Sequence, residues 1–305
     1  MTVHIAETTQ VTTEDGARLR VQTFGASDAP TIVLSHGWAC RIEYWKPQID
    51  ALASSYRVIA YDQRGHGHSS RGRTPLTADV LADDFAAVID HVMGGGRAVT
   101  VGHSMGGITL MAWWHRHPEQ AARTSAATVL ANTTTGGLAR GTRIFPLLNG
   151  VVPAPVALGK LVLGTPIRIP RGPVVREAVR QRTMNPRTAT RAQAAFVADI
   201  VRRCDPVTRA GAAAALIDLD LGAAAVRSVA SPTTVTIGRV DKLTPPWMGR
   251  AIAKTLDDTG HLEHLIELDT GHAGNVEMAS VFNTIVSKAA DKHLGPSVER
   301  ANHPT

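Results

Sequence analysis

The sequence predicts an α/β protein built on a mostly parallel, doubly wound sheet, with an antiparallel hairpin at its start and a helical insertion in its second half. Short apolar stretches alternate with amphipathic helical stretches from residue 31 to 132. The alternation is lost between 133 and 230, and it resumes from 233 to 294. Because the apolar stretches are short and continuous, they are typical of parallel strands that are buried on both faces.

The first expected element is a β-hairpin. Two stretches, 8–13 and 17–24, flank a turn formed by Glu14, Asp15 and Gly16. Turn residues between two β-prone stretches are typical of paired antiparallel strands. We therefore expect these strands to form the antiparallel start of the sheet.

The next hundred residues contain four expected strands and three expected helices. The helices are identified by apolar residues at helical spacing, and Thr77 stands where it would cap the second of them. The last of these helices is expected to stop at Pro118, which cannot continue it. The expected strands are 31–35, 56–62, 98–102 and 125–132, and the expected helices are 42–54, 78–92 and 108–117.

The end of the chain is expected to complete the sheet. Two further strands, 233–237 and 262–268, alternate with two further helices, 246–256 and 275–294. A strand that is followed by a helix and then by another strand is the unit from which parallel sheets are built. We therefore expect these elements to continue the sheet begun by the first half.

The chain thus divides into a core and an insertion. We expect 1–132 and 231–305 to form the core domain, and 133–230 to form a helical cap. Within the insertion the clearest helical segments are 175–183 and 189–204. Such an insertion is either a lid over the active site or a structural excursion without a gating role.

The composition is that of a globular protein with unevenly distributed charge. The chain has 305 residues, 44% of them apolar, and a formal net charge of +6. The segment 139–209 contains twelve arginines and Lys160, but its only acidic residues are Glu177, Asp199 and Asp205. Such a segment attracts an anionic substrate, an acidic partner or a membrane surface, or it is simply a solvated face. Nucleic-acid binding is not expected, because the arginines are not interleaved with aromatic residues.

Cysteine usage and hydropathy predict the compartment. Cys40 and Cys204 are expected to be unpaired thiols in a reducing environment. The first ten residues lack the basic and apolar regions of a signal peptide. Stable membrane insertion is not expected, because two prolines, an asparagine and a lysine interrupt the apolar stretch 146–164. A cytoplasmic location is predicted on these grounds.

The strongest chemical signal is the run GHSMGG at 102–107. It lies between an expected strand and an expected helix, which is the setting of a G-x-S-x-G nucleophile elbow. Small residues two positions before and after the serine are needed, because the backbone there approaches its neighbours closely. The helix N-terminus offers N–H groups and a positive dipole end to a developing oxyanion. The pattern predicts that Ser104 is a nucleophile.

With this motif in its setting, the sequence resembles the α/β-hydrolase family over about residues 8–294, and the resemblance implies the α/β-hydrolase fold. The run SHGW at 35–38 looks like the family's H-G-x oxyanion loop. By that resemblance, the backbone N–H groups of Trp38 and Met105 form the oxyanion hole. The run DQRGHGHS at 62–69 is similar to the family's D-x-R-G-x-G-x-S turn, whose role is structural.

The acid and the base of a catalytic triad are expected later in the chain, in the order Ser, acid, His. Asp241 follows the strand 233–237, in a segment that resembles the family's G-x-x-D-x-x-x-P loop. His272 follows the strand 262–268. Both therefore lie at the carboxyl ends of strands, where open α/β sheets place their sites. We expect His272 to be the general base and Asp241 to orient it.

Two alternatives for the acid are less favoured. Asp269 lies close to His272 in sequence, but a contact between them would require a forced local geometry. Some relatives in the family carry the acid after an earlier strand. Here that place reads Ala131, Asn132 and Thr133, without a carboxylate.

No metal and no other cofactor is expected. His115 and His117 form one pair of histidines, and His261 and His264 form another. Neither pair is completed by a carboxylate or a cysteine at a useful spacing. A serine mechanism also needs no metal ion.

The expected reaction is hydrolysis of a carboxylic ester, a lactone or a thioester through an acyl-enzyme. A serine at the elbow disfavours haloalkane dehalogenases and epoxide hydrolases, which the family resemblance associates with an aspartate there. Four alternatives remain open: a cofactor-free haloperoxidase (perhydrolase), a carbon–carbon bond hydrolase, an acyltransferase and a small-molecule receptor on the same fold.

The substrate is expected to be a small apolar molecule. The start of the cap, 144–164, is strongly hydrophobic, although this run is equally well explained by packing against the core. The residues expected to line the pocket are Trp38, His103, Phe145 and Leu147. Further aromatic candidates are Tyr44, Trp45, Trp113 and Trp114, of which the adjacent Trp113 and Trp114 cannot share one helix face. The oligomeric state is left open.

Overall fold

The computed structural model describes residues 7–138 and 165–295. Within these ranges the chain forms an eight-stranded sheet with the strand order β1-β2-β4-β3-β5-β6-β7-β8. The strands are β1 (Glu7–Thr12), β2 (Arg18–Phe24), β3 (Thr31–Ser35), β4 (Arg57–Tyr61), β5 (Ala98–His103), β6 (Ser125–Ala131), β7 (Thr233–Gly238) and β8 (Leu262–Leu268).

The hairpin and the parallel sheet are both confirmed. β1 pairs antiparallel with β2, and β2 pairs antiparallel with β4. From β4 through β8 every neighbouring pair of strands runs parallel. All residues of β3, β5, β6 and β7 are buried. Continuous apolar runs therefore mark the strands that helices cover on both faces.

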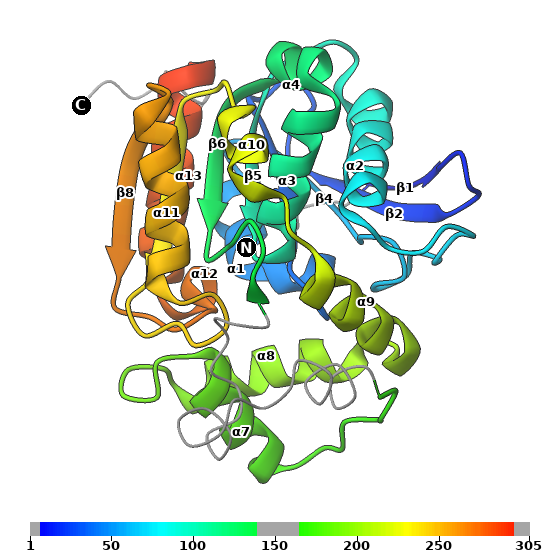
Figure 1. Ribbon diagram of the computed structural model, residues 1–305, viewed down its shortest axis with the longest axis vertical. Helices are drawn as coiled ribbons and strands as arrows, with labels where there is room; N and C mark the ends of the chain where they lie inside the picture. Colours follow the sequence, from blue (N-terminus) through cyan, green and yellow to red (C-terminus); the bar gives the residue numbers. More distant parts are fainter. Residues whose placement is uncertain (1–6, 139–164, 296–305) are drawn as a thin grey trace.

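Helices cover both faces of the sheet (Figure 1). On one face α2, α3, α10 and α11 pack around a core that includes Phe85 and Ile252. On the other face α1 and α13 pack around Ile49 and Phe282. The helical elements are η1 (Ile42–Trp45), α1 (Lys46–Leu52), α2 (Ala78–Met93), α3 (Met105–Arg116), α4 (Pro118–Thr124), α7 (Pro173–Thr183), α8 (Arg191–Arg203), α9 (Pro206–Asp218), α10 (Gly222–Arg227), α11 (Pro246–Asp258), α12 (Gly274–Glu277) and α13 (Ala279–Leu294).

Most of the aromatic residues considered for the pocket belong to the core instead. Trp113 and Trp114 lie on α3 and are both fully buried. Trp113 packs edge-to-face against Phe85 of α2, with ring centroids 5.0 Å apart. Trp45 stacks on Phe282 of α13. Trp113 and Trp114 are therefore core residues, because α3 is covered by α2 on one side and by the sheet on the other.

The expected cap contains four described helices, three of which lie together at one end of the molecule. In Figure 1, α7, α8 and α9 lie below the tips of the β6 and β8 arrows, at the carboxyl edge of the sheet. α10 does not belong to this group, because its Ala225 and Val226 are buried in the same core as α3 and α11. We use "cap helices" for α7, α8 and α9. The hydrophobic run 144–164, with Phe145 and Leu147, lies outside the described residues.

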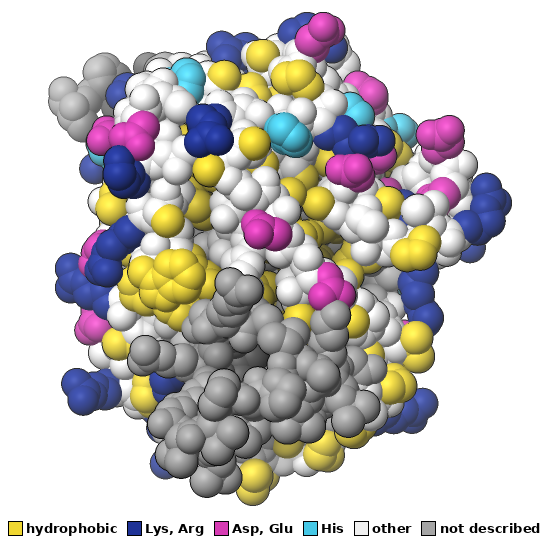
Figure 2. All heavy atoms as spheres, viewed as in Figure 1, with side chains coloured by type: hydrophobic (Ala, Val, Ile, Leu, Met, Phe, Trp, Pro, Cys, Tyr) yellow, Lys and Arg dark blue, Asp and Glu magenta, His cyan; other side chains and the backbone are white. Residues whose placement is uncertain are grey.

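Charged side chains are dispersed on the face seen in Figure 2, where Lys and Arg are interleaved with Asp and Glu. In the arginine-rich segment 139–209, the carboxylates of Glu177, Asp199 and Asp205 each form an ion pair. Glu177 pairs with Arg180 at 2.8 Å, and Asp199 pairs with Arg202 at 2.7 Å. Across 7–138 and 165–295, no helix combines the length and the apolar character that crossing a membrane requires.

Candidate active site

Ser104 stands at the sharp turn between β5 and α3. Its backbone has φ +55° and ψ −118°, a conformation that non-glycine residues rarely adopt. Two backbone bonds hold it there: the Ser104 N–H donates to the carbonyl of Ala131 at 2.9 Å, and Thr133 Oγ1 donates to the Ser104 carbonyl at 2.7 Å. The side chain is neither fully buried nor fully exposed. This is the strained, projecting geometry predicted for a nucleophile elbow.

The glycines around Ser104 are required by close approach of the backbone. A Cβ on Gly106 would lie 1.9 Å from the carbonyl oxygen of Ser35. A Cβ on Gly102 would lie 2.5 Å from the carbonyl oxygen of Gly106. Neither clash can be relieved by a rotamer change, because both partners are backbone atoms. The pattern of small residues therefore follows from the packing of β5, β3 and α3.

Met105 and Trp38 meet the same turn from two sides. Met105 is the first residue of α3, so its N–H has no acceptor within the helix. Gly37, next to Trp38, is so close that a Cβ there would lie 3.0 Å from Ser104 Cβ. The loop is held from below by Gln63, whose N–H donates to His36 Nε2 at 3.0 Å and whose side-chain amide donates to the His36 carbonyl. The loop that carries Trp38 and the first residue of α3 therefore both lie next to Ser104.

The indole of Trp38 connects this loop to the cap helices. Trp38 Nε1 donates to the carbonyl of Arg209 on α9 at 2.8 Å. The ring packs, partly buried, beside a cluster that includes Met105, Ile108 and Leu216. Trp38 therefore links the loop 35–38 to α9 and packs against apolar side chains.

Asp241 and His272 form a hydrogen-bonded pair. His272 Nδ1 lies 2.8 Å from Asp241 Oδ2, and both residues are buried. Since an ionised carboxylate only accepts hydrogen bonds, the imidazole proton at Nδ1 donates to it. The other ring nitrogen, Nε2, is then the one with a free lone pair. That tautomer is the one a general base for Ser104 needs.

Asp241 is held as a carboxylate. Its Oδ1 accepts from the N–H groups of Leu243 and Thr244, at 2.8 and 3.0 Å. Its Oδ2 accepts from Thr244 Oγ1 at 2.8 Å and from Asn132 Nδ2 at 3.0 Å, besides His272. Burial alone raises the pKa of Asp241, but the charge of His272 and the hydrogen bonds from its neighbours outweigh burial and leave the pKa below its ordinary value.

The backbone around His272 is fixed by residues from four different elements. The Gly271 N–H donates to the Glu277 carboxylate at 3.0 Å, and Asn132 Nδ2 donates to the Gly271 carbonyl at 3.1 Å. The His272 N–H donates to the carbonyl of Thr183, at the end of α7, at 2.8 Å. His103 Nε2 donates to the His272 carbonyl at 2.8 Å. A cap helix and the sheet therefore position the histidine together.

His103 lies behind the histidine loop. Its imidazole is buried and packs in a tilted arrangement against the rings of His272 and Tyr44, with ring centroids 4.9 and 5.2 Å away. Burial, followed by the charge of His272, lowers the pKa of His103 to about 3, so its ring is neutral. This placement gives His103 a role in holding the loop rather than in contacting a substrate.

The run 62–69 has the structural role expected of it. Asp62 accepts hydrogen bonds from the N–H groups of Ile42 and His68, at 2.7 and 2.9 Å. Arg64 is buried between Asp15 and Asp84, each 2.7 Å away. Burial lowers the pKa of His66 to about 4, which keeps this histidine neutral. The turn ties the hairpin to α2 and supports the oxyanion loop.

The histidine pairs have ordinary surroundings. His115 Nδ1 lies 3.0 Å from Ser228 Oγ, and His117 Nε2 lies 2.7 Å from Asp83 Oδ1. His261 and His264 flank the start of the edge strand β8. In the part of the chain that the structure describes, no group of three or more His, Cys, Asp and Glu side chains could hold a metal ion.

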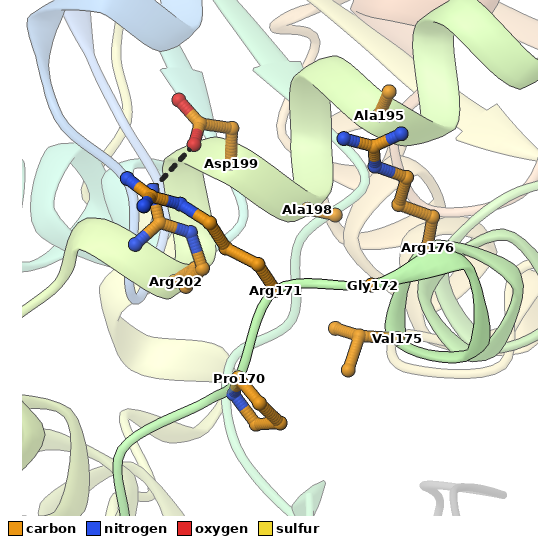
Figure 3. A pocket seen from close by; sticks show the side chains of 9 residues that line it. All are labelled: Pro170, Arg171, Gly172, Val175, Arg176, Ala195, Ala198, Asp199 and Arg202. Carbon is orange, nitrogen blue, oxygen red and sulfur yellow. Dashed lines mark hydrogen bonds and ion pairs between the residues drawn. The ribbon is translucent and has the colours of Figure 1, made fainter.

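A small cavity of about 60 Å³ lies within the cap helices and not at the serine (Figure 3). It is lined by the start of α7 and by one face of α8, with Arg171, Arg176 and Arg202 around it. Asp199 already pairs with Arg202 there, at 2.7 Å. Because Ser104 and His272 are not among its lining residues, this cavity is separate from the candidate active site.

Several residues that build the site carried no sequence signal. Asn132 is one, since at the sequence level its position was notable only for lacking a carboxylate. Thr244 and Glu277 are two more; each follows a motif residue by three to five positions, a spacing that indicates proximity but not a role. Only the three-dimensional contacts reveal that all three contact the Asp241–His272 pair or its loop.

With fold and site in place, comparison with known proteins defines the class. The sequence pattern described as "Alpha/beta hydrolase family" matches residues 32–283. This range covers most of the chain and includes Ser104, Asp241 and His272. The chain therefore belongs to the alpha/beta hydrolase family.

The chain is also similar to individual relatives and to solved structures. The chain is 39% identical over 109 residues to a bifunctional esterase/perhydrolase of Acinetobacter calcoaceticus; the alignment covers 35% of the chain and 39% of that relative, well under half of either. It is similar to the solved structure of an enol-lactonase from Burkholderia xenovorans, with a TM-score of 0.71, 26% identity and coverage of 92% of this chain and 99% of the other. A thermophilic esterase from Thermogutta terrifontis shares the fold, with a TM-score of 0.76, 21% identity and coverage of 94% and 100%.

Proposed function

We propose that the protein is a serine hydrolase that cleaves a carboxylic ester, a lactone or a thioester of a small, largely apolar molecule. One observation carries the proposal. Ser104 stands on a strained turn, the residue before it, His103, is hydrogen-bonded to the carbonyl of His272, and the Asp241–His272 hydrogen bond leaves Nε2 free to accept a proton. The similarity to an esterase/perhydrolase and to an enol-lactonase supports acyl chemistry at such a site.

In the first half-reaction Ser104 Oγ attacks the carbonyl carbon of the substrate. His272 Nε2 takes the hydroxyl proton, and Asp241 stabilises the imidazolium that forms. The carbonyl oxygen becomes an oxyanion, for which the N–H groups of Trp38 and Met105 are the proposed donors. Collapse of this intermediate expels the alcohol or thiol, which takes the proton from His272.

The second half-reaction releases the acid. His272 takes a proton from a water molecule, and the hydroxide adds to the acyl-enzyme carbonyl. The same donors stabilise the second oxyanion. Ser104 leaves as the alkoxide and regains the proton from His272, which restores the free enzyme.

An apolar substrate is supported by what surrounds the serine. The cluster formed by Met105, Ile108, Leu81 and Leu216 begins at the residue after Ser104 and reaches α9. Trp38 and Leu219 pack against it. Apolar groups next to Trp38 and Met105 favour an alkyl or aryl portion of the substrate at this side of the site.

We also propose that the segment 133–221 acts as the cap over this site. The support is the place of α7, α8 and α9 at the carboxyl edge of the sheet, where open α/β proteins bind ligands. The proposed boundary ends before α10, because that helix belongs to the core packing. The cap then contributes a wall to the site through Thr183 and Arg209, whose carbonyls bind His272 and Trp38.

Perhydrolysis is the second candidate. It is favoured by the relative from Acinetobacter, which is described as both esterase and perhydrolase. Peroxide would then replace water as the acceptor of the acyl group. The serine, the histidine and the oxyanion donors would have the same roles.

A panel of p-nitrophenyl esters of rising chain length, assayed with and without peroxide, tests the function. We expect turnover that climbs over the first few carbons, by about fourfold for each methylene buried, and then a plateau. The matched control is Ser104→Ala, which keeps the fold and lacks the nucleophile. Turnover near zero for every ester, with tight binding of a small molecule, would instead indicate a receptor on this scaffold.

A further inference from the structure

Two arginines among the described residues are buried, and only one of them has anionic partners. Arg64 is 6% exposed and Arg209 is 8% exposed. Arg64 pairs with Asp15 and Asp84 and donates to two backbone carbonyls as well. Arg209 Nη2 donates to the carbonyl of Ile167, and its Nη1 is buried with no hydrogen-bond partner. Among the described residues, no carboxylate lies within ion-pair distance of Arg209.

The groups nearest to Arg209 do not supply the missing charge. Asp205, one turn earlier on the same helix, pairs with Arg71 at 2.9 Å. Cys204 interacts with Arg209, but burial raises the pKa of this thiol to about 12, so it stays neutral. In the described structure, neither of these two groups therefore forms an ion pair with the Arg209 guanidinium.

Residues outside the described ranges offer little to change this. The stretch 139–164 contains neither Asp nor Glu, and neither do residues 1–6. Glu299 is the only acidic side chain among the last ten residues. Within the described residues, Arg209 therefore has no anionic partner.

A guanidinium that stays charged in a buried place is costly unless it is paired. An apolar side chain at this position, such as Met or Leu, would not carry the cost of burying a charge. The five N–H donors of arginine match the two oxygens of a carboxylate. An arginine kept without an internal partner therefore fits a site whose anion arrives with a ligand.

The place of Arg209 links it to the candidate active site. Its own carbonyl accepts the indole N–H of Trp38, at 2.8 Å. Trp38 belongs to the loop in which Gly37 touches Ser104 Cβ. The backbone of Arg209 is thus joined to the oxyanion loop by the indole of Trp38, and the same helix, α9, carries Leu216 of the apolar cluster that includes Met105.

We propose that Arg209 is a specificity-determining residue that binds a carboxylate on the substrate, away from the scissile bond. This inference rests on the proposed function and narrows it: the substrate is an ester or lactone with an apolar middle and one carboxylate end. The apolar cluster beside Trp38 would hold the middle, and Arg209 would hold the charged end.

The kinetic test compares matched esters. The substrates are phenyl monoesters of succinic, glutaric and adipic acid and phenyl esters of neutral acids of equal length. We expect the wild type to prefer one of the charged esters. In Arg209→Met we expect kcat/KM for that ester to fall by about 100-fold, mostly through KM, because a buried charge pair is lost. For the neutral esters kcat/KM should change by less than threefold. Arg171→Met, at an exposed cap arginine, is the matched control and should keep the wild-type preference.

A binding test works without turnover, so it separates this inference from the proposed function. The probe is glutarate, titrated into Ser104→Ala and into the double variant Ser104→Ala/Arg209→Met, with thermal shift and calorimetry as readouts. We expect glutarate to raise the melting temperature of the first protein and not of the second. We also expect Arg209→Met to be at least as stable as the wild type without ligand, whereas Arg64→Met should be clearly less stable.

Three results would overturn the assignment. The first is equal use of charged and neutral esters by the wild type together with no binding of glutarate. The second is a loss of stability in Arg209→Met as large as that in Arg64→Met, which would show that Arg209 has a partner within the chain. The third is binding of inorganic phosphate at the same strength as glutarate without any preference for charged esters, which would indicate a general anion site.

Discussion

The loops that follow β5, β7 and β8 differ sharply from the cap helices at the same edge of the sheet. In the loops, Asp241 and His272 are buried, and hydrogen bonds join Asp241 to His272 and Asn132, and Glu277 to Gly271. α7, by contrast, has no buried residue, and α8 buries only the face formed by Ala194, Val197, Ala198 and Ile200. The loops at the strand ends therefore hold their side chains in fixed positions, whereas the side chains of α7 and most of those of α8 are not buried.

This difference separates chemistry from selection. A general base works only if it is held within hydrogen-bond distance of the group whose proton it takes, and rigid strand ends can supply that positioning. A wall that meets the variable part of a substrate has no such requirement. The exceptions are the points where the cap reaches into the loops, at Thr183, Asn185 and Arg209, and these contacts are where the two regions depend on each other.

The largest expected effect comes from breaking the core side of the contrast. We expect His272→Ala and Asp241→Asn each to lower kcat by about 10³-fold or more, as in other triads. Asp241 has a lowered pKa, so its stabilising charge is present above its ordinary value of 3.8 and is lost only at more acidic pH. Steady-state kinetics at pH 8 measure the loss. Near-normal activity of Asp241→Asn would move the acid role elsewhere, with Asp269 as the first residue to test.

A smaller effect is expected at the junction of the two regions. The Glu277 carboxylate accepts hydrogen bonds from the N–H of Gly271 at 3.0 Å and from the N–H of Asn185 at 2.7 Å. Asn185 lies two residues after the end of α7. Burial raises the pKa of Glu277 to about 7, against the lowering effect of these two hydrogen bonds. Asp241 raises it further and His272 lowers it.

The sign for stability follows from this shift. The folded protein holds the Glu277 proton more tightly than the unfolded chain does, so the unfolding free energy falls as the pH rises from 4.5 to about 7. We expect a fall of about 2 kcal/mol after allowance for partial exposure. Urea unfolding of wild type and Glu277→Gln at pH 5 and pH 8 measures it. An equal pH dependence in both proteins would contradict the assignment.

The smallest expected effect is on kcat/KM, from the loss of a single hydrogen bond to Asp241. Thr244→Val removes the hydroxyl that donates to Asp241 Oδ2 at 2.8 Å, and it keeps the shape of the side chain. We expect kcat/KM to fall about fivefold, the value of one ordinary hydrogen bond. Thr236→Val on β7 is the matched control, because Thr236 Oγ1 is buried and has no partner in the described structure. If both variants behave alike, the hydrogen bond to Asp241 has no catalytic value.

The sequence predicted the sheet almost completely, because each strand is a short apolar run with turn residues beside it. It missed α4, since Pro118 was read as the end of a helix although proline also favours a first helical position. It missed α9 as well, whose alanine-rich sequence has little amphipathic periodicity. In both cases local pattern was weak and tertiary packing decided the structure.

At the candidate site, the sequence predicts only residues that stand in motifs. Ser104, Asp241 and His272 each follow a strand within a recognisable run. Asn132, Glu277 and Arg209 stand in no motif, and their importance arises from contacts across as many as 171 residues, as between Trp38 and Arg209. Such contacts depend on how the cap sits on the sheet, which a linear pattern does not contain.

Covalent labelling of Ser104 is the most direct test of the central claim, that the strained serine is an activated nucleophile. A fluorophosphonate probe is incubated with the wild type, with Ser104→Ala and with His272→Ala, and the modified peptide is located by mass spectrometry. We expect one label, on the peptide that contains GHSMGG, in the wild type, a much slower reaction in His272→Ala and none in Ser104→Ala. Full labelling that persists in Ser104→Ala would contradict the claim.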